Sequence, residues 1–239
     1  MALYAIADLH LSDGTNKPMD IFGARWKDHT DKIVSRWSSL VTADDTVIIP
    51  GDVSWAMTLE EAAADFRLID SLPGKKIIGK GNHDYWWTTA SKMKRFLESI
   101  GVAAVDFLFN NAFATDEAVI CGTRGWYIEE KLQDTPDPTD YEKIVNRECQ
   151  RLDLSLKTGA SLKGDQDIPT FAFLHFPPVF GDFVCEPIID TLLAHGVNQC
   201  YYGHIHGKYL IPHTFEYRGV NLSIISADYL NFTPQRIFI

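Results

Sequence analysis

The chain has 239 residues, of which 46% are hydrophobic and 23% are charged, enough apolar material for one sizeable core. Its 32 acidic and 22 basic residues give a formal net charge of -10, which argues against a general nucleic-acid binder, because attraction to phosphates needs Lys and Arg. The N-terminus has no basic lead, Asp8 interrupts its apolar run, and no later run approaches membrane length, so we expect a cytoplasmic protein without a signal peptide or a membrane partner.

The first half of the chain alternates short apolar runs with helical patterns. Three runs predict buried strands, at 3–7, 46–49 and 75–78. Three patterns at helical spacing follow them, at 33–41, 59–69 and 93–100. This order is typical of a parallel sheet with helices outside it, in which ligands bind at the carboxyl ends of the strands.

The second half of the chain is less regular. Strands are expected at 107–115 and 118–122, as a hairpin, and at 170–174 and 199–202. Helices are expected at 141–156 and 188–193. The last three runs predict antiparallel strands at 210–217, 220–226 and 236–239. Since no linker, repeat or low-complexity segment interrupts the chain, we expect one domain over 1–239.

Polar side chains stand where these predicted strands end. They are Asp8, His10, Asp52, Asn82, His83, His175, His204 and His206. A lone Asp after a strand is usually a helix cap, and a lone His is usually a surface or core residue. That explanation would be needed eight times at one edge of a sheet. Imidazole and carboxylate are natural ligands of Mn²⁺, Fe and Zn²⁺, and the absence of Cys from these eight residues argues against a structural zinc site.

The order of these residues resembles the calcineurin-like metallophosphoesterase family. The matching blocks are Asp8-Leu9-His10, Gly51-Asp52, Gly81-Asn82-His83-Asp84, His175 and Gly203-His204-Ile205-His206. They span most of the chain, and no ligand of the family pattern is missing. The resemblance implies an α/β fold built as a two-sheet β-sandwich flanked by helices, in the layer order α/β/β/α. This fold accommodates the antiparallel end of the chain better than a single doubly wound sheet does.

The resemblance also implies two divalent transition metal ions. The ligands it implies are Asp8, His10 and His206 for one ion and Asn82, His175 and His204 for the other, with Asp52 bridging the two. We expect Mn²⁺, with Fe or Zn²⁺ as alternatives. A water between the ions would lose much of its pKa and supply the attacking hydroxide near neutral pH.

Four further residues would act on the substrate. By the same resemblance, His83 would stabilise charge on the phosphoryl group or protonate the leaving oxygen, and Asp84 would orient His83. Arg124 could hold a phosphate oxygen, or it could be a surface residue in a turn. Trp86 could stack on a base, or it could pack at the rim of the site.

The sequence therefore predicts a dinuclear metal-dependent hydrolase of a small phosphoester: a phosphomonoester, a nucleotide, or a cyclic or linear phosphodiester. Two alternatives stay open. A nuclease on the same fold should carry a basic track, which the acidic composition disfavours, and a non-catalytic scaffold should have lost ligands. The loops 12–29 and 126–140 are long enough to narrow the site, which favours a small substrate over a long nucleic acid. The oligomeric state is left open.

Overall fold

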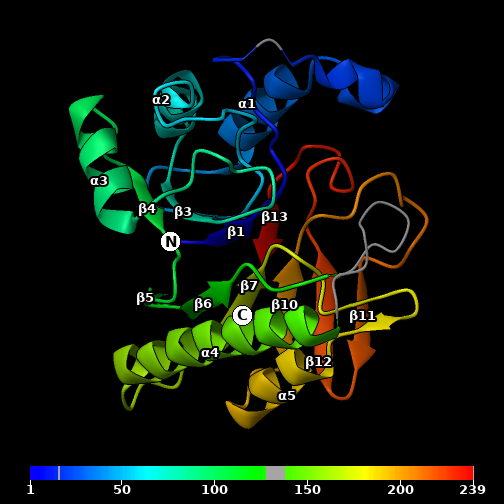
Figure 1. Ribbon diagram of the computed structural model, residues 1–239. Coiled ribbons are helices and arrows are strands. Elements are labelled where there is room, and N and C mark those ends of the chain that lie inside the picture. Colours follow the sequence, from blue (N-terminus) through cyan, green and yellow to red (C-terminus); the bar gives the residue numbers. More distant parts are fainter. Residues whose placement is uncertain (16, 128–137, 239) are drawn as a thin grey trace.

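The computed structural model describes residues 1–15, 17–127 and 138–238, and their strands form two main sheets (Figure 1). The first sheet consists of β1 (Leu3–Ala5), β2 (Thr46–Pro50), β3 (Lys75–Gly79), β4 (Val105–Phe107) and β13 (Gln235–Ile237). Its order is β13-β1-β2-β3-β4, and only β13 runs antiparallel to its neighbour. The helices that cover its outer face are α1 (His29–Leu40), α2 (Ala63–Ser71) and α3 (Ala90–Ser99).

The second sheet lies beneath the first in Figure 1. It consists of β5 (Ala112–Ala114), β6 (Val119–Thr123), β7 (Thr170–Leu174), β10 (Gln199–Tyr202), β11 (Thr214–Tyr217) and β12 (Val220–Ile224). Its order is β11-β12-β10-β7-β6-β5, with parallel central strands and antiparallel edge strands β5 and β11. Helices α4 (Pro138–Lys163) and α5 (Glu186–Ala194) cover the outer face. The predicted sandwich of two sheets flanked by helices is confirmed.

Apolar side chains fill the space between the layers. Ile48 from the first sheet meets Phe171 and Phe173 from the second, and all three are almost fully buried. Trp37 of α1 and Leu152 of α4 occupy the layers between the helices and the two sheets. Each such side chain contributes about 1.5–3 kcal/mol when it leaves water. Among the described residues, none of the helices is long and apolar enough to cross a membrane.

Three predicted elements differ from the structure. The run 107–115 does not form one strand, because a turn at Asn110, with φ of 60°, separates β4 in the first sheet from β5 in the second. The last strands are not one antiparallel set: β12 pairs parallel with β10, and β13 crosses to β1. Helix α4 continues past 156 and ends before Gly164, whose φ of 54° suits a residue without a Cβ.

Two short features were not predicted. The loop 12–29 contains two 3-10 helices, η1 (Met19–Phe22) and η2 (Ala24–Trp26). A small hairpin, β8 (Val179–Phe180) and β9 (Phe183–Val184), follows β7. Both features lie just beyond the carboxyl end of a strand, where they shape the surroundings of the expected site.

Candidate metal centre

Strands from both sheets end at one place in the molecule. There Ala7, after β1, forms a parallel bridge with Ser226, after β12. The Ala7 N–H also donates a hydrogen bond of 2.8 Å to the Ile225 carbonyl. The residues that follow β1, β2, β3, β7 and β10 therefore converge although they come from distant parts of the chain.

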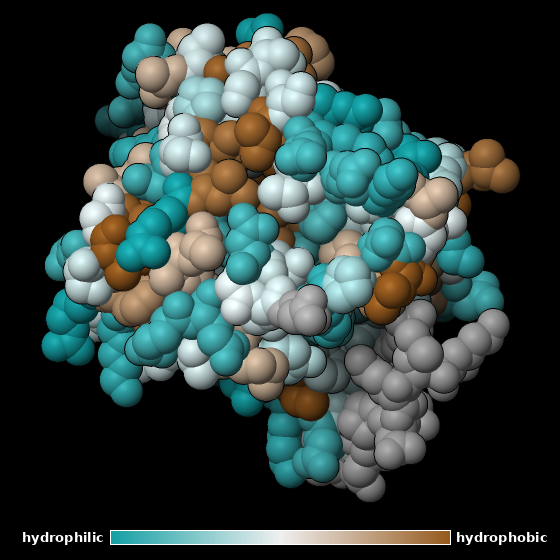
Figure 2. Space-filling view, turned by 90° about the horizontal axis from the view of Figure 1, so that it is seen from above, coloured by the Kyte–Doolittle hydropathy of each residue, from teal (hydrophilic) through white to brown (hydrophobic). Residues whose placement is uncertain are grey.

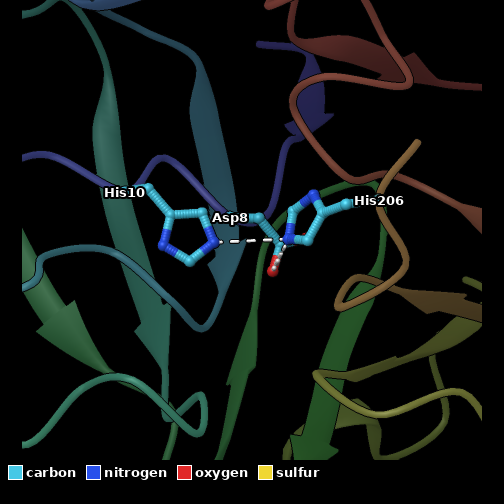
Figure 3. A group of neighbouring side chains, drawn as sticks. All are labelled: Asp8, His10 and His206. Carbon is cyan, nitrogen blue, oxygen red and sulfur yellow. Dashed lines mark hydrogen bonds and ion pairs between the residues drawn. The ribbon is translucent and has the colours of Figure 1, made fainter. Parts of the chain in front are cut away.

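The first group of candidate ligands is Asp8, His10 and His206. One ligand atom from each lies within 4.8 Å of the others, so together they could hold a metal ion. The Nε2 atoms of His10 and His206 are 3.3 Å apart, and His206 Nε2 lies 4.0 Å from Asp8 Oδ1. Figure 3 shows the three side chains pointing toward one another from two separate segments. Asp8 and His10 are buried, whereas His206 is one-third exposed.

The second group is Asp52, His175 and His204, which meets the same distance criterion. Asn82 joins it, since its Oδ1 lies 2.6 Å from His175 Nε2. The Asp52 carboxylate stands between the two groups: Oδ2 is 3.6 Å from His175 Nε2 and 3.7 Å from His10 Nε2. The seven expected ligands thus lie together, and Asp52 has the position that a shared ligand requires.

The protonation states of these groups suit metal ligands. Burial lowers the pKa of His10 and His175 well below the usual value and that of His204 to about 3, so the imidazoles are neutral, as metal binding requires. The Pro50 carbonyl lies 3.2 Å from His175 Nδ1. Because a carbonyl can only accept, this contact favours the tautomer with the proton on Nδ1 and leaves Nε2 free to ligate.

The Asp8 and Asp52 carboxylates are buried, and a bound cation would stabilise their charged forms. Burial raises the pKa of Asp8 to about 6 and that of Asp52 well above its usual range, because both charged forms are desolvated. Asp52 Oδ2 is buried and has no hydrogen-bond partner among the described residues. Buried carboxylate oxygens are costly unless a donor or a cation satisfies them. The donor set, nitrogen and oxygen without thiolate, fits divalent transition metal ions.

The sequence analysis did not identify Asp228, which supports His206. Its Oδ1 accepts a hydrogen bond of 2.8 Å from His206 Nδ1, and Oδ2 accepts from the Gly207 N–H and the Tyr209 hydroxyl. Burial would raise the pKa of Asp228, but the hydrogen bonds, foremost that of His206, outweigh it and lower the pKa. Asp228 follows the buried strand β12 as Asp8 follows β1. That strand-end position is a signal that could have identified it.

Asp84 makes a different contact from the one expected. Its carboxylate accepts backbone N–H groups of Gly81, Asp52 and Val53 at 2.7–2.9 Å. No hydrogen bond joins it to the His83 ring in the described part of the chain, and His83 Nδ1 has no partner there. The expectation that Asp84 orients His83 is therefore corrected: Asp84 connects the loop after β2 to the loop after β3, because their buried amides need an acceptor.

His83 lies beside the first group of ligands. Its ring centroid is 5.7 Å from that of His10 and 4.2 Å from that of Trp55. Burial, assisted by the positive charge of Lys17, lowers the pKa of His83 to about 4. The ring is therefore neutral near pH 7.

The backbone at the site takes conformations that cost energy. Left-handed φ values occur at four expected ligands: 61° at Asp8, 48° at His10, 53° at Asp52 and 69° at His204. Such values are unfavourable for residues with a Cβ and cluster at functional sites. Two glycines are also required, since a Cβ on Gly81 would lie 2.0 Å from Asp52 Oδ1 and one on Gly203 would lie 2.6 Å from Asp8 Oδ2.

The two candidate substrate residues differ in access. Trp86 is 2% exposed and packs edge-to-face on Phe66 in the core, so the expectation that it could stack on a substrate is wrong. The adjacent Tyr85 is exposed, so the burial of Trp86 does not extend to every aromatic residue of this loop. Arg124 is half-buried, its carbonyl accepts the N–H groups of His175 and Phe176, and its side chain lines a cavity. Arg124 thus remains a candidate.

A mainly apolar cavity of about 260 Å³ adjoins the first group of ligands. His10, His83 and His206 form one side of it. Met19 and Trp26, from the loop 12–29, also line this cavity, so part of the loop lies beside the candidate site. The second loop, 126–140, falls largely on residues 128–137, which are outside the described residues.

Comparisons with known proteins agree with this architecture. A solved phosphopantetheinyl hydrolase (PptH) from Mycobacterium tuberculosis is similar at 17% identity and a TM-score of 0.55, covering 99% of this chain and 95% of that one. The protein TT1561 of Thermus thermophilus is similar at 12% identity and a TM-score of 0.56, covering 98% and 97%. At such identities the likeness shows the fold alone. Among curated proteins no match was found.

The family model described as calcineurin-like phosphoesterase matches residues 1–208. The matched range contains both groups of candidate metal ligands and most of the two sheets. The chain belongs to the calcineurin-like phosphoesterase family.

Proposed function

We propose that the protein hydrolyses a small phosphoester with two divalent metal ions in this centre. The position of Asp52 carries the proposal, since its Oδ2 lies at nearly equal distances, 3.7 and 3.6 Å, from His10 and His175 in the two groups. In this assignment the ligands are Asp8, His10 and His206 for one ion, Asn82, His175 and His204 for the other, and Asp52 for both. The ligand set supports Mn²⁺, with Fe or Zn²⁺ as alternatives.

The protein's own groups prepare this site. When bound, the two ions activate water and neutralise the charge of the phosphate. Asp228 and the Pro50 carbonyl each hold one imidazole in the tautomer whose Nε2 points to the site. The backbone contacts of Asp84 keep the ligand loops together. Such preorganisation removes the cost of arranging ligands during the reaction.

The environment of His83 supports a role in charge stabilisation. A ring with a pKa of about 4 is neutral at pH 7, and nearby cations would lower that pKa further. A neutral ring can donate one N–H to a phosphoryl oxygen but holds no excess proton for the leaving group. Of the two roles that stayed open for His83, hydrogen bonding to the phosphoryl group is the better supported.

Several features support a small substrate. The cavity beside His83 measures about 260 Å³ and is walled by Trp26 and Trp55, which suits a small apolar or planar group. The net charge of -10 would repel a long polyanion. The similar fold of a protein named as a phosphopantetheinyl hydrolase supports hydrolase chemistry. We also propose that residues 1–239 act as one domain, because β13 returns to pair with β1.

The test is an assay of the purified protein with Mn²⁺ on panels of phosphomonoesters, phosphodiesters, nucleotides and DNA. We expect hydrolysis of small phosphoesters that Asp52→Asn abolishes, whereas Asp116→Asn, in an exposed bend, retains it. Full activity in Asp52→Asn or after complete chelation would overturn the proposal. Efficient cleavage of DNA that is lost in His206→Ala would assign the protein to the nucleases of this fold.

A further inference from the structure

A second cavity, of about 550 Å³, is lined by four basic side chains. Lys80 follows β3, Arg124 follows β6, and Arg147 and Arg151 come from α4; we call them the basic pocket. Trp87 and Phe109, with ring centroids 5.9 Å apart, contribute aromatic surface to the same cavity. The sequence analysis did not predict this cluster, because its four members come from three separate segments.

The basic pocket carries more positive charge than its neighbours neutralise. Glu148 is the buried carboxylate nearby, and it bonds to Arg151 at 2.6 Å and to the Thr123 hydroxyl at 2.8 Å. Within the described residues no ion pair involves Lys80, Arg124 or Arg147. Such a concentration of cations is unexpected in a chain with a net charge of -10.

The arrangement is unfavourable for the fold itself. Arg147 and Arg151 stand four residues apart on α4, a spacing at which like charges destabilise a helix. Burial lowers the pKa of Arg124 most, the charge of Glu148 raises it, and the charges of Arg151 and Arg147 lower it, so the three guanidinium groups repel one another around a single buried carboxylate. An anion in the cavity would relieve this repulsion. Guanidinium groups bind both carboxylate and phosphate through two parallel hydrogen bonds. The proposed phosphoesterase function favours phosphate of the two.

The basic pocket adjoins the second group of metal ligands. Lys80 is separated from Asn82 by Gly81 alone. The Arg124 carbonyl accepts the His175 N–H at 3.1 Å, which fixes the start of the Arg124 side chain beside that ligand. Arg147 is exposed on α4, so the pocket opens to the surface.

We propose that the basic pocket binds a second phosphate group of the substrate, so that the preferred substrate carries two phosphates, one at the metal centre and one among Lys80, Arg124 and Arg147. This inference rests on the proposed phosphoesterase function. Trp87 and Phe109 would contact the part of the substrate that joins the two phosphates. The substrate class is then an organic bisphosphate rather than a simple monoester.

The test compares phenyl phosphate with the matched meta- and para-phenylene bisphosphates, using the metal-loaded protein. We expect the wild type to hydrolyse at least one bisphosphate with a kcat/KM about 10- to 100-fold higher, the range for charge-assisted hydrogen bonds. Arg147→Gln should reduce this preference severalfold. Arg67 is an exposed arginine on α2 outside the pocket, so Arg67→Gln is the matched control. It should keep the kcat/KM of the wild type for phenyl phosphate and for the preferred bisphosphate. Because Arg147 is exposed and repels its neighbours, its replacement should not lower the melting temperature.

The outcomes separate this inference from the proposed function. Hydrolysis of phenyl phosphate without preference for a bisphosphate would overturn the inference and leave the phosphoesterase function standing. A preference that survives in both Arg147→Gln and Lys80→Gln would also overturn it. A third outcome is that no bisphosphate is preferred, but inorganic phosphate alters the hydrolysis of phenyl phosphate by the wild type and not by Arg147→Gln. That result would overturn the inference and assign the pocket to free phosphate. Hydrolysis of no phosphoester at all would overturn both.

Discussion

Individual residues of the candidate metal centre have backbone conformations and buried polar atoms that are unfavourable for folding. Asp8, His10, Asp52 and His204 have left-handed backbone conformations, and Asp52 keeps a buried oxygen without a hydrogen-bond donor among the described residues. Such conformations cost of order 1–3 kcal/mol each and persist where the surrounding structure requires them. Here the arrangement is the convergence of seven candidate ligand side chains.

At this scale Asp228 provides a test. Asp228→Asn preserves the shape of the side chain but removes the charge that stabilises His206 in the Nδ1–H tautomer. We expect the affinity for Mn²⁺ to fall about 10- to 100-fold, the usual range for a group that orients a metal-binding histidine. Titration calorimetry on metal-depleted protein measures this. Asp44→Asn, on an exposed loop, is the control, and equal affinities in the two variants would show that Asp228 does not act through His206.

At the scale of elements, buried polar groups connect strands to the helices and loops around them. Lys76, in β3, is completely buried and donates its ammonium group to the carbonyls of Leu72 and Asp70. The end of α2 is thereby tied to the strand that leads to Asn82 and His83. Such contacts hold a buried lysine in place, although the desolvation of its charge is unfavourable.

Lys76 predicts a pH dependence of stability. Burial lowers its pKa from 10.5 to about 8, so between these values the unfolded chain binds a proton that the folded chain lacks. The free energy of unfolding should therefore rise as pH increases through this window, by at most about 3 kcal/mol. Urea unfolding of the wild type and of Lys76→Met from pH 7 to 10 gives the difference in their free energies of unfolding at each pH. The contributions of the other titrating groups are common to both proteins and cancel in this difference. A constant difference between the two proteins would contradict the assignment.

At the scale of the whole molecule, the metal centre joins the two sheets. His10 follows β1 of the first sheet and His206 follows β10 of the second, and their Nε2 atoms are 3.3 Å apart. On the face seen in Figure 2, hydrophilic side chains predominate and apolar ones gather in limited patches among them.

Metal removal should consequently loosen the sandwich. A ligand that binds only the folded state stabilises it by about 2.7 kcal/mol at a concentration one hundred times its Kd. We expect chelation to lower the melting temperature of the wild type by several degrees, as scanning calorimetry would record. Asp52→Asn should show a much smaller difference between its metal-treated and chelated forms. An identical melting temperature with and without chelator would contradict a metal centre that spans both sheets.

The sequence patterns by themselves determined the alternation of strands and helices and the candidate ligands, whereas the two-sheet sandwich was implied by the resemblance to a family. Strand-loop-helix order depends on local periodicity, and strand ends are where a parallel sheet presents its functional side chains. Asp52 and His175 could therefore be placed at strand ends from the sequence, but the edge of one sheet expected for them was wrong, because β2 and β7 belong to different sheets. The resemblance of the ordered motifs to a family added the pairing of ligands into two groups, and the structure brings these groups together.

Only the tertiary structure decided the contacts between segments far apart in the chain. Trp86 looked available to a substrate but lies in the core, and Asp84 meets backbone amides rather than His83. Asp228 was identified by its hydrogen bond to His206. The basic pocket was identified because α4 approaches the ends of β3 and β6. The physical reason is common to all four: burial and long-range hydrogen bonding depend on which surfaces pack together, and the spacing of residues along a chain does not encode that packing.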